Sequence, residues 1–416
     1  MLLSYIKIAW KVLLRRKFFT FISLFGISFT LMVLLVVVAM FDNFQGAHAP
    51  ESRVKRMAFV SFMSQRFKDG GQMNTPVSPY FLDKYVRPMK TPEKVAVYSL
   101  FHATPAYIGN KKLDLDLKFT DAVFWEVFDF HFLEGKPYLA QDVRSANRVV
   151  VITETTARQY FGAATGVVGR DIVVDQRRFR VVGVVSDVPA LRFNSYAEVW
   201  APLTTTKADI RNPVLEGDYF AALLAPEGTP LEALETEYQQ IVSRVTIPNR
   251  DVKKLVTHAD PLLASLTRQL FGPIGGDSSD KTALFYAVTV GLTLLFMLLP
   301  ALNLVNINLS RILERSSEIG VRKAFGATGS TLVGQFLIEN IFLTLLGGVL
   351  GLVLAYAALE AISEANFISY AHFTLNLRVF GWALLVTVVF GVLSGVYPAF
   401  KMSRLQPVQA LKGSAS

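Results

Sequence analysis

Cysteine is absent from the 416-residue chain, which excludes disulfides, thiolate nucleophiles and thiolate metal ligands. Histidine is scarce, and no two histidines stand in the His-x-x-x-His spacing of a helical metal site. The chain has five of them: His48, His102, His131, His258 and His372. A Gly-x-Ser-x-Gly nucleophile elbow is also missing. These absences predict no metal site and no catalytic residue, and the scattered polar residues offer no pattern for either.

The nucleotide-binding motif Gly-x-x-x-x-Gly-Lys-Ser/Thr is a further absence. The nearest glycine-rich stretch, Gly320–Thr331, lacks the lysine that follows the second glycine of the motif and binds the phosphates. We therefore expect no ATP to bind this chain in the P-loop manner, and no cofactor-binding residue is predicted.

The excess of Lys and Arg over Asp and Glu gives a formal net charge of +9, but its distribution does not indicate nucleic-acid binding. Between Asp42 and Lys281 the 29 Lys/Arg residues nearly match the 28 Asp/Glu residues. The excess lies in short segments beside apolar runs, where it would set membrane orientation and attract anionic lipid. Membrane lipid is thus an expected partner, and nucleic acid is not.

Four apolar runs are long enough to cross a bilayer as helices, which takes about 20 residues each. They are Phe18–Phe41, Thr282–Leu309, Thr331–Leu359 and Val379–Phe400. Basic residues flank them at alternate ends, namely Lys7, Lys11, Arg15, Arg16, Lys17, Arg311, Arg315, Arg322, Lys323, Lys401, Arg404 and Lys412. The positive-inside rule then places both termini on the cytoplasmic side of the membrane.

This topology predicts an α-helical four-span transmembrane domain with a large mixed α/β extracytoplasmic domain. Strand-like runs such as Arg148–Ile152 and Phe179–Val185 alternate there with helical patterns such as Leu231–Val245. The expected segments are an amphipathic helix at 1–17, spans at 18–41, 282–309, 331–359 and 379–400, the extracytoplasmic domain at 42–281, a cytoplasmic loop at 310–330, a short outer loop at 360–378 and a tail at 401–416.

The cytoplasmic loop 310–330 carries paired charges between two spans. Glu314 and Glu318 lie among basic residues at helical spacing, and glycines interrupt the segment. An amphipathic helix held at the membrane surface is suited to bind a cytoplasmic partner, whereas a solvated turn with basic anchors is the simpler alternative. Within the spans, Glu339, Asn303 and Asn306 are polar groups that we expect to face other helices. A structural role for Glu339, bonded to an asparagine of the second span or a basic loop residue, is favoured over a functional one.

Three stretches resemble one family, the MacB/FtsX-like permeases of ABC transporters. The loop sequence Glu314-Arg315-x-x-Glu318-Ile319-Gly320-Val321-Arg322-Lys323-Ala324-x-Gly326 is similar to the family's signature loop. Tyr397-Pro398-Ala399, followed by Leu405-x-Pro407, resembles its C-terminal end. Between Phe124 and Pro189 the run Glu134-Gly135-Lys136-Pro137 and the later Val149–Glu154 and Val181–Val185 resemble a MacB-type periplasmic core domain.

The resemblance implies a permease subunit that is not itself an ATPase. Its loop residues Glu314, Arg315, Glu318, Ile319, Gly320, Val321, Arg322, Lys323, Ala324 and Gly326 would form a coupling helix on a partner ATPase, which would bind the ATP and Mg²⁺. Because only Met1–Lys17 precede the first span, that ATPase is expected on a separate chain. The outer domain would be porter-like, with a β-rich insertion at about 130–205. Further expected partners are a second permease chain, a periplasmic adaptor and an outer-membrane channel.

The function implied is mechanotransmission, in which ATP hydrolysis in the cytoplasm changes the conformation of the extracytoplasmic domain for export or for lipoprotein, peptide or drug handling. One alternative is an FtsX-like regulator that activates an envelope hydrolase or a sensor kinase, although the large outer domain argues against it. A second alternative is a membrane-tethered enzyme with its active site in 42–281, for which the sequence offers no motif.

Overall fold

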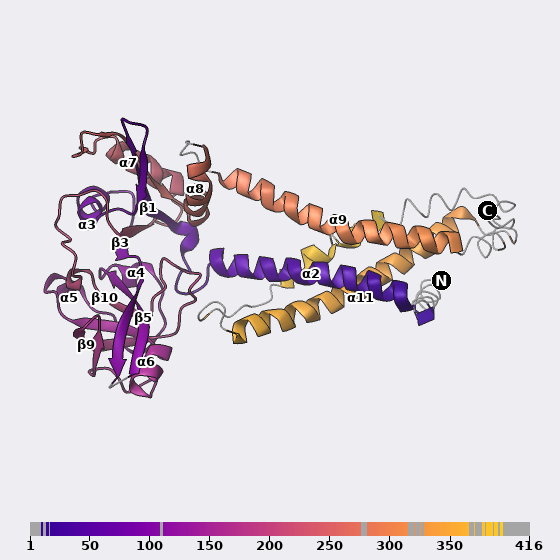
Figure 1. Ribbon diagram of the computed structural model, residues 1–416, viewed down its shortest axis with the longest axis horizontal. Coiled ribbons are helices and arrows are strands. Elements are labelled where there is room, and N and C mark those ends of the chain that lie inside the picture. The colour runs from indigo at the N-terminus through magenta and orange to yellow at the C-terminus, as the bar shows by residue number, and fades with distance from the viewer. Residues whose placement is uncertain are drawn as a thin grey trace. The chain divides into compact units, whose positions relative to one another are not determined.

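The computed structural model describes residues 10, 14–15, 17–108, 111–275, 281–314, 321, 325, 328–365, 370, 377–378, 380–385, 387–389 and 392–393 (Figure 1). The chain forms two compact units. The helical unit comprises Met1–Phe41, Tyr286–Ala365 and Phe373–Ser416, and the sheet unit comprises Asp42–Phe285 and Asn366–His372.

Three long helices dominate the described part of the helical unit: α2 (Lys17–Gln45), α9 (Thr282–Glu314) and α11 (Gly329–Glu364). Thr328 caps α11 by accepting a hydrogen bond from the Thr331 amide at 3.4 Å. Lys17–Gln45 and Val333–Glu364 are long and apolar enough to cross a membrane, and the described apolar stretches Thr282–Phe296 and Phe380–Val389 are shorter. The count of four spans therefore stays a prediction.

Helix α2 packs closely on α11 because α11 has glycines at the contact. A Cβ atom added to Gly347 would lie 2.7 Å from the Ile27 side chain, and one added to Gly351 would lie 2.9 Å from the Leu31 side chain. Small residues let helix backbones approach where no hydrophobic driving force acts in lipid. Gly347 and Gly351 thus allow the two helices to approach closely, whereas a Cβ atom added to Gly334 would have nothing within 4 Å.

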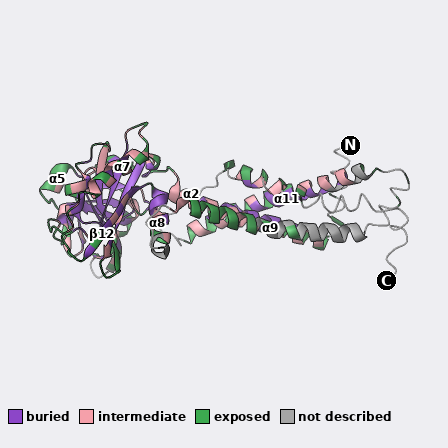
Figure 2. Cartoon of the chain, turned by 90° about the horizontal axis from the view of Figure 1, so that it is seen from above, coloured by how far each residue is buried: buried purple, intermediate pink, exposed green. Residues whose placement is uncertain are grey.

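The sheet unit contains a 12-stranded sheet in which most strands are buried on at least one face (Figure 2). Its strands are β1 (Met57–Phe67), β2 (Gln72–Thr75), β3 (Lys94–Ser99), β4 (His102–Ile108), β5 (Lys111–Thr120), β6 (Phe132–Gly135), β7 (Val149–Thr153), β8 (Asp171–Val174), β9 (Arg177–Val185), β10 (Val199–Pro202), β11 (Tyr219–Leu224) and β12 (Val252–Asp260). The strands expected at 148–152 and 179–185 are confirmed, because their β-branched runs suit a buried sheet.

One part of this sheet is an antiparallel layer in the order β12-β1-β11-β3. With α3 (Pro79–Phe81) and the π-helix η2 (Leu82–Val86) after β1, and α7 (Leu231–Val242) after β11, the order is that of a split βαβ motif. Helix α7 packs on β12 and β1 and buries Leu234 and Tyr238. The expected helix at 231–245 is thus confirmed over most of its length.

The other part is a closed ring of pairings, β10-β7-β9-β8-β4-β5, which β5 completes by pairing in parallel with β10. Closure leaves no free edge in this small barrel. The barrel strands are inserted in the sequence between β3 and β11. They include β4 and β5 as well as strands from the range 130–205. The predicted limits of the segments stay predictions.

Four short helices complete the sheet unit: α4 (Phe124–Val127), α5 (Ala140–Arg144), α6 (Glu154–Phe161) and α8 (Leu262–Gly275). The one-turn elements η1 (Val54–Arg56) and η3 (Leu203–Thr205) lie beside β1 and β10. The aromatic stretch from Phe124 is core, as its composition suggests, since Phe124 and Phe128 are fully buried with Trp200 and Tyr98.

Candidate functional site

The predicted coupling loop lies mostly outside the described residues. Glu314 is the last residue of α9, and Val321 is 44% exposed. The remaining predicted residues are outside the described part: Arg315, Glu318, Ile319, Gly320, Arg322, Lys323, Ala324 and Gly326. Between them Phe325 is 88% exposed, a large apolar side chain on the surface of the described part of the chain. The role of the loop in binding an ATPase stays a prediction.

The predicted intramembrane polar residues are placed in two helices. Glu339 is buried in α11, and its Oε1 accepts a hydrogen bond from the Gln335 amide one turn earlier, at 3.2 Å. Asn303 and Asn306 lie in α9, but their side chains are outside the described part. A partner of Glu339 is therefore found on its own helix, and the structural role predicted for it stays open to test.

A buried network of charges, which the sequence did not reveal, lies in the sheet unit. The guanidinium of Arg192 is 3.6 Å from the carboxylate of Glu51, and the two side chains are only 2% and 1% exposed. Glu51 Oε1 also accepts hydrogen bonds from the Ser195 amide at 3.2 Å and the Ser195 hydroxyl at 2.8 Å. Burial raises the pKa of Glu51, while Arg192 and Ser195 favour its charged form.

Lys118 of β5 belongs to the same network. Its ammonium group donates to the backbone carbonyls of Phe193 and Asn194 at 2.7 and 2.8 Å and lies 5.2 Å from the centre of the Tyr98 ring. Burial lowers the pKa of Lys118 to about 7, although Glu51 and Asp116 act in the opposite direction. A basic and an acidic group are thus held inside the fold by the loop that precedes Tyr196.

The network is joined to the end of α2. Arg192 Nη2 donates to the carbonyl oxygens of Asn43 and Gly46 at 2.9 and 3.2 Å, and the Phe44 ring packs edge-on against Phe193. The Asn43 carbonyl is among the last four of the helix, which have no partner within it, and Gly46 directly follows the helix. We call Glu51, Lys118, Arg192 and Ser195 the α2 anchor, because they hold the C-terminal turn of α2 on the sheet unit.

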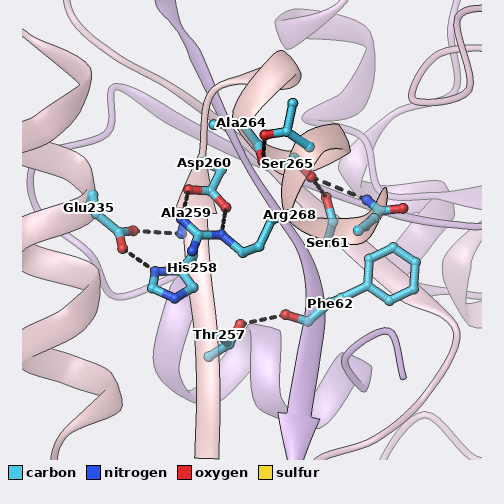
Figure 3. Close-up of polar contacts among 12 residues, drawn as sticks. Ser61, Phe62, Glu235, Thr257, His258, Ala259, Asp260, Ala264, Ser265 and Arg268 are labelled. Carbon is cyan, nitrogen blue, oxygen red and sulfur yellow. Dashed lines mark hydrogen bonds and ion pairs between the residues drawn. The ribbon is translucent and has the colours of Figure 1, made fainter. Parts of the chain in front are cut away.

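A second set of polar contacts holds α8, the helix that precedes α9 in the sequence (Figure 3). Arg268 makes a bidentate ion pair with Asp260 at the end of β12, at 2.7 and 2.9 Å. Ser265 donates to Ser61 of β1 at 3.1 Å. We call Ser61, Asp260, Ser265 and Arg268 the α8 anchor.

Glu235 of α7 fixes the strand beside the α8 anchor. Its carboxylate accepts hydrogen bonds from the Ala259 amide and from His258 Nδ1, both at 2.7 Å. This assigns the Nδ1 proton to His258 and orients its ring (Figure 3). Glu235 and the α8 anchor thus connect α7, β12, β1 and α8 within the sheet unit.

Two domain families match this chain. Residues 20–241 match the MacB-like periplasmic core domain, and residues 290–407 match the FtsX-like permease C-terminal domain. These matches define a membrane protein with a large extracytoplasmic domain. The chain belongs to the MacB/FtsX-like family of ABC transporter permeases, as its sequence motifs predicted. Both matches fall on permease domains.

Individual relatives differ in length from this chain. The macrolide export ATP-binding/permease protein MacB 1 of Yersinia pestis bv. Antiqua is 28% identical over 289 residues, which cover 69% of this chain and 42% of the relative. The pyoverdine export protein PvdT of Pseudomonas savastanoi is 27% identical, covering 99% and 59%. The permease YknZ of Bacillus subtilis is 22% identical, covering 99% of both. The chain thus spans less than half the length of the MacB relative.

Solved structures resemble the chain only loosely. The periplasmic region of MacB from Actinobacillus actinomycetemcomitans has a TM-score of 0.37 at 16% identity and covers 49% of this chain and 87% of its own. A domain of a permease from Porphyromonas gingivalis has a TM-score of 0.40 at 18% identity, covering 50% and 90%. The family assignment rests on the sequence matches.

Proposed function

We propose that the chain is the permease subunit of a MacB-like ABC system that transmits ATP-driven motion from a partner ATPase to its extracytoplasmic domain. The observation that carries this proposal is the α2 anchor. A buried ion pair is strongly destabilised when one partner is lost, by about 3–5 kcal/mol. A displacement of α2 would therefore move the sheet unit with it rather than bend the joint between Arg192 and the helix end.

The cytoplasmic end of this transmission is proposed to be the loop 310–330. Its charged residues at helical spacing would seat on the ATPase, where ATP and Mg²⁺ are bound. The exposed Phe325 supports a contact of this kind, because its ring has no cover within the described chain. Hydrolysis on the partner would shift the loop and the helices on either side of it.

The remaining parts of the assembly belong to the proposal as well. A second permease chain would complete the membrane part, with both termini in the cytoplasm and the chain in the inner membrane. Glu339, Asn303 and Asn306 would pack between helices there, away from lipid. A periplasmic adaptor and an outer-membrane channel would extend the system if it exports its cargo. Relatives are named for macrolides and for pyoverdine, which supports export or handling of a drug, peptide or lipoprotein.

The test is co-purification of the tagged full chain with separately encoded ABC ATPases from the same genome. Wild type is expected to retain one ATPase that hydrolyses ATP, and Glu318→Lys should lose it because the loop would then repel its seat. Glu360→Lys is the matched control, since it makes the same charge change at an exposed position of α11 outside the loop. Equal retention by wild type and Glu318→Lys would overturn the coupling assignment.

A further inference from the structure

The wall between β1 and α8 contains two adjoining pockets, both within the sheet unit. The aromatic pocket has a volume of about 260 Å³ and the polar pocket about 300 Å³. They share four lining residues: Ser61, Phe62, Ser265 and Gln269. Two chemically different cavities thus meet along one line of side chains, which includes the Ser61–Ser265 hydrogen bond (Figure 3).

The aromatic pocket is suited to an apolar group of limited size. Rings line most of it: Phe44, Phe59, Tyr98, Phe101, Phe193 and Phe220. Leu266 of α8 closes one side. Because an apolar cavity of about 150 Å³ binds benzene, this pocket can take an aromatic ring with substituents or a short alkyl chain.

The polar pocket is suited to a head group that forms hydrogen bonds. Hydroxyl and amide side chains line it, namely Ser64, Gln72, Asn74 and Thr257, together with His258 and the Asp260–Arg268 pair. Arg66 also lines it as a donor. Since Asp260 neutralises Arg268, recognition here depends on directed hydrogen bonds more than on net charge.

Two buried polar atoms support a ligand at this site. Within the described chain, Ser64 Oγ and His258 Nε2 have no hydrogen-bond partner. A buried polar atom left in this state costs about 1–3 kcal/mol. His258 cannot relieve it through Nδ1, which is already bonded to Glu235. A head group that reached either atom after a small side-chain rotation would recover part of this free energy.

We infer that the two pockets form one binding site for a small amphipathic molecule, with an aromatic or short alkyl end in the aromatic pocket and a hydroxyl- or amide-rich end in the polar pocket. The site borders both anchors, since the aromatic pocket is lined by Phe193 and Asn194, whose carbonyls accept hydrogen bonds from Lys118, and the polar pocket by Ser265 and Arg268. A ligand that fills both pockets would therefore contact β1, α8 and the loop that holds Lys118. This inference needs no ATPase and stands apart from the proposed function.

Photolabelling of the full chain in lipid nanodiscs tests the site. The probe is an octyl glucoside with a diazirine on its alkyl chain, used below its micellar concentration, because it has a short apolar end and a hydroxyl-rich head. Mass spectrometry should find labels in peptides of β1 and α8, and excess unlabelled octyl glucoside should reduce them at least tenfold. Labels confined to α9, α11 and the part of α2 that precedes Phe44, which itself lines the aromatic pocket, would show lipid partitioning only and would overturn the inference.

Two variants on one helix sharpen the test. Leu266→Trp would fill the aromatic pocket and is expected to abolish the competable labelling. Leu270→Trp makes the same change four residues later, where the side chain is 53% exposed and outside both pockets, and should leave labelling unchanged. Equal labelling in the two variants contradicts the site. The labelled positions in wild type decide the question even if Leu266→Trp does not fold.

Discussion

The two anchors hold the last turn of α2 and the helix α8 on the sheet by different means. In the α2 anchor the Arg192 and Glu51 side chains are 2% and 1% exposed, and they bond to backbone from two separate segments. In the α8 anchor the Arg268 and Asp260 side chains are 18% and 10% exposed, and they border a cavity. The ion pair of the α2 anchor is enclosed in the core, whereas that of the α8 anchor lines the polar pocket.

This difference predicts that the α2 anchor is stiffer than the α8 anchor. An enclosed ion pair cannot open without leaving a buried charge uncompensated, whereas a pair beside a cavity can exchange its partner for water. We therefore expect α2 to move together with the sheet unit, and α8 to be the connection that adjusts when the helices shift.

Removal of Arg192 should have the largest effect. Arg192→Met leaves Glu51 buried without its cation, so the free energy of unfolding of the sheet unit should fall by about 3–5 kcal/mol. Urea unfolding followed by the fluorescence of buried Trp200 would measure it. Arg158→Met removes an arginine whose side chain is 63% exposed in an i,i+4 pair, and should cost only about 0.3–0.5 kcal/mol. Similar losses in both variants would refute the special role of the α2 anchor.

Lys118 should make the stability of the same anchor depend on pH. Its folded pKa of about 7 lies below the ordinary lysine value of 10.5, so the unfolded chain binds more protons between these limits. The unfolding free energy should therefore rise with pH, by roughly 2 kcal/mol from pH 7 to pH 9. Lys118→Met should remove this rise when its urea midpoints are compared with those of wild type. An identical pH slope in both proteins would contradict the assignment.

Helix α2 also packs on α11 through Gly351. A larger side chain at this contact should lower stability more than the same change at a position with no close neighbour. Gly351→Leu forces a side chain against Leu31 and the Ser28 backbone, which should cost about 1–3 kcal/mol. Gly334→Leu is the matched control, because nothing lies within 4 Å of its added Cβ atom. Thermal unfolding in nanodiscs should show a lower midpoint for Gly351→Leu alone.

The α8 anchor should respond least. Arg268→Met removes a partly exposed ion pair whose remaining carboxylate can reach water in the polar pocket, so we expect a loss of about 1 kcal/mol. Hydrogen–deuterium exchange should increase in α8 and leave residues 187–196 unchanged. A loss as large as that of Arg192→Met would erase the proposed contrast between the anchors.

Sequence patterns predicted long apolar helices, of which Lys17–Gln45 and Val333–Glu364 are long and apolar enough to cross a membrane, the strands near 148–152 and 179–185, and the family. These follow from apolar runs, β-branched runs and short motifs. They did not predict the α2 anchor. In β5 the residues Leu113, Leu115 and Leu117 alternate with charged ones, which places Lys118 on the face expected to be solvated. It is buried because loop 187–196 covers that face, and a contact between residues 51, 118 and 192 leaves no periodic signal.

The most direct test of the account is hydrogen–deuterium exchange of the full chain bound to its partner ATPase in nanodiscs, without nucleotide and with ATP trapped. We predict that exchange in α8 changes between the two states while residues 187–196 stay protected, and that Glu318→Lys abolishes the change. Opening of residues 187–196 with ATP, or no change in the sheet unit during ATP hydrolysis, would contradict transmission through the α2 anchor.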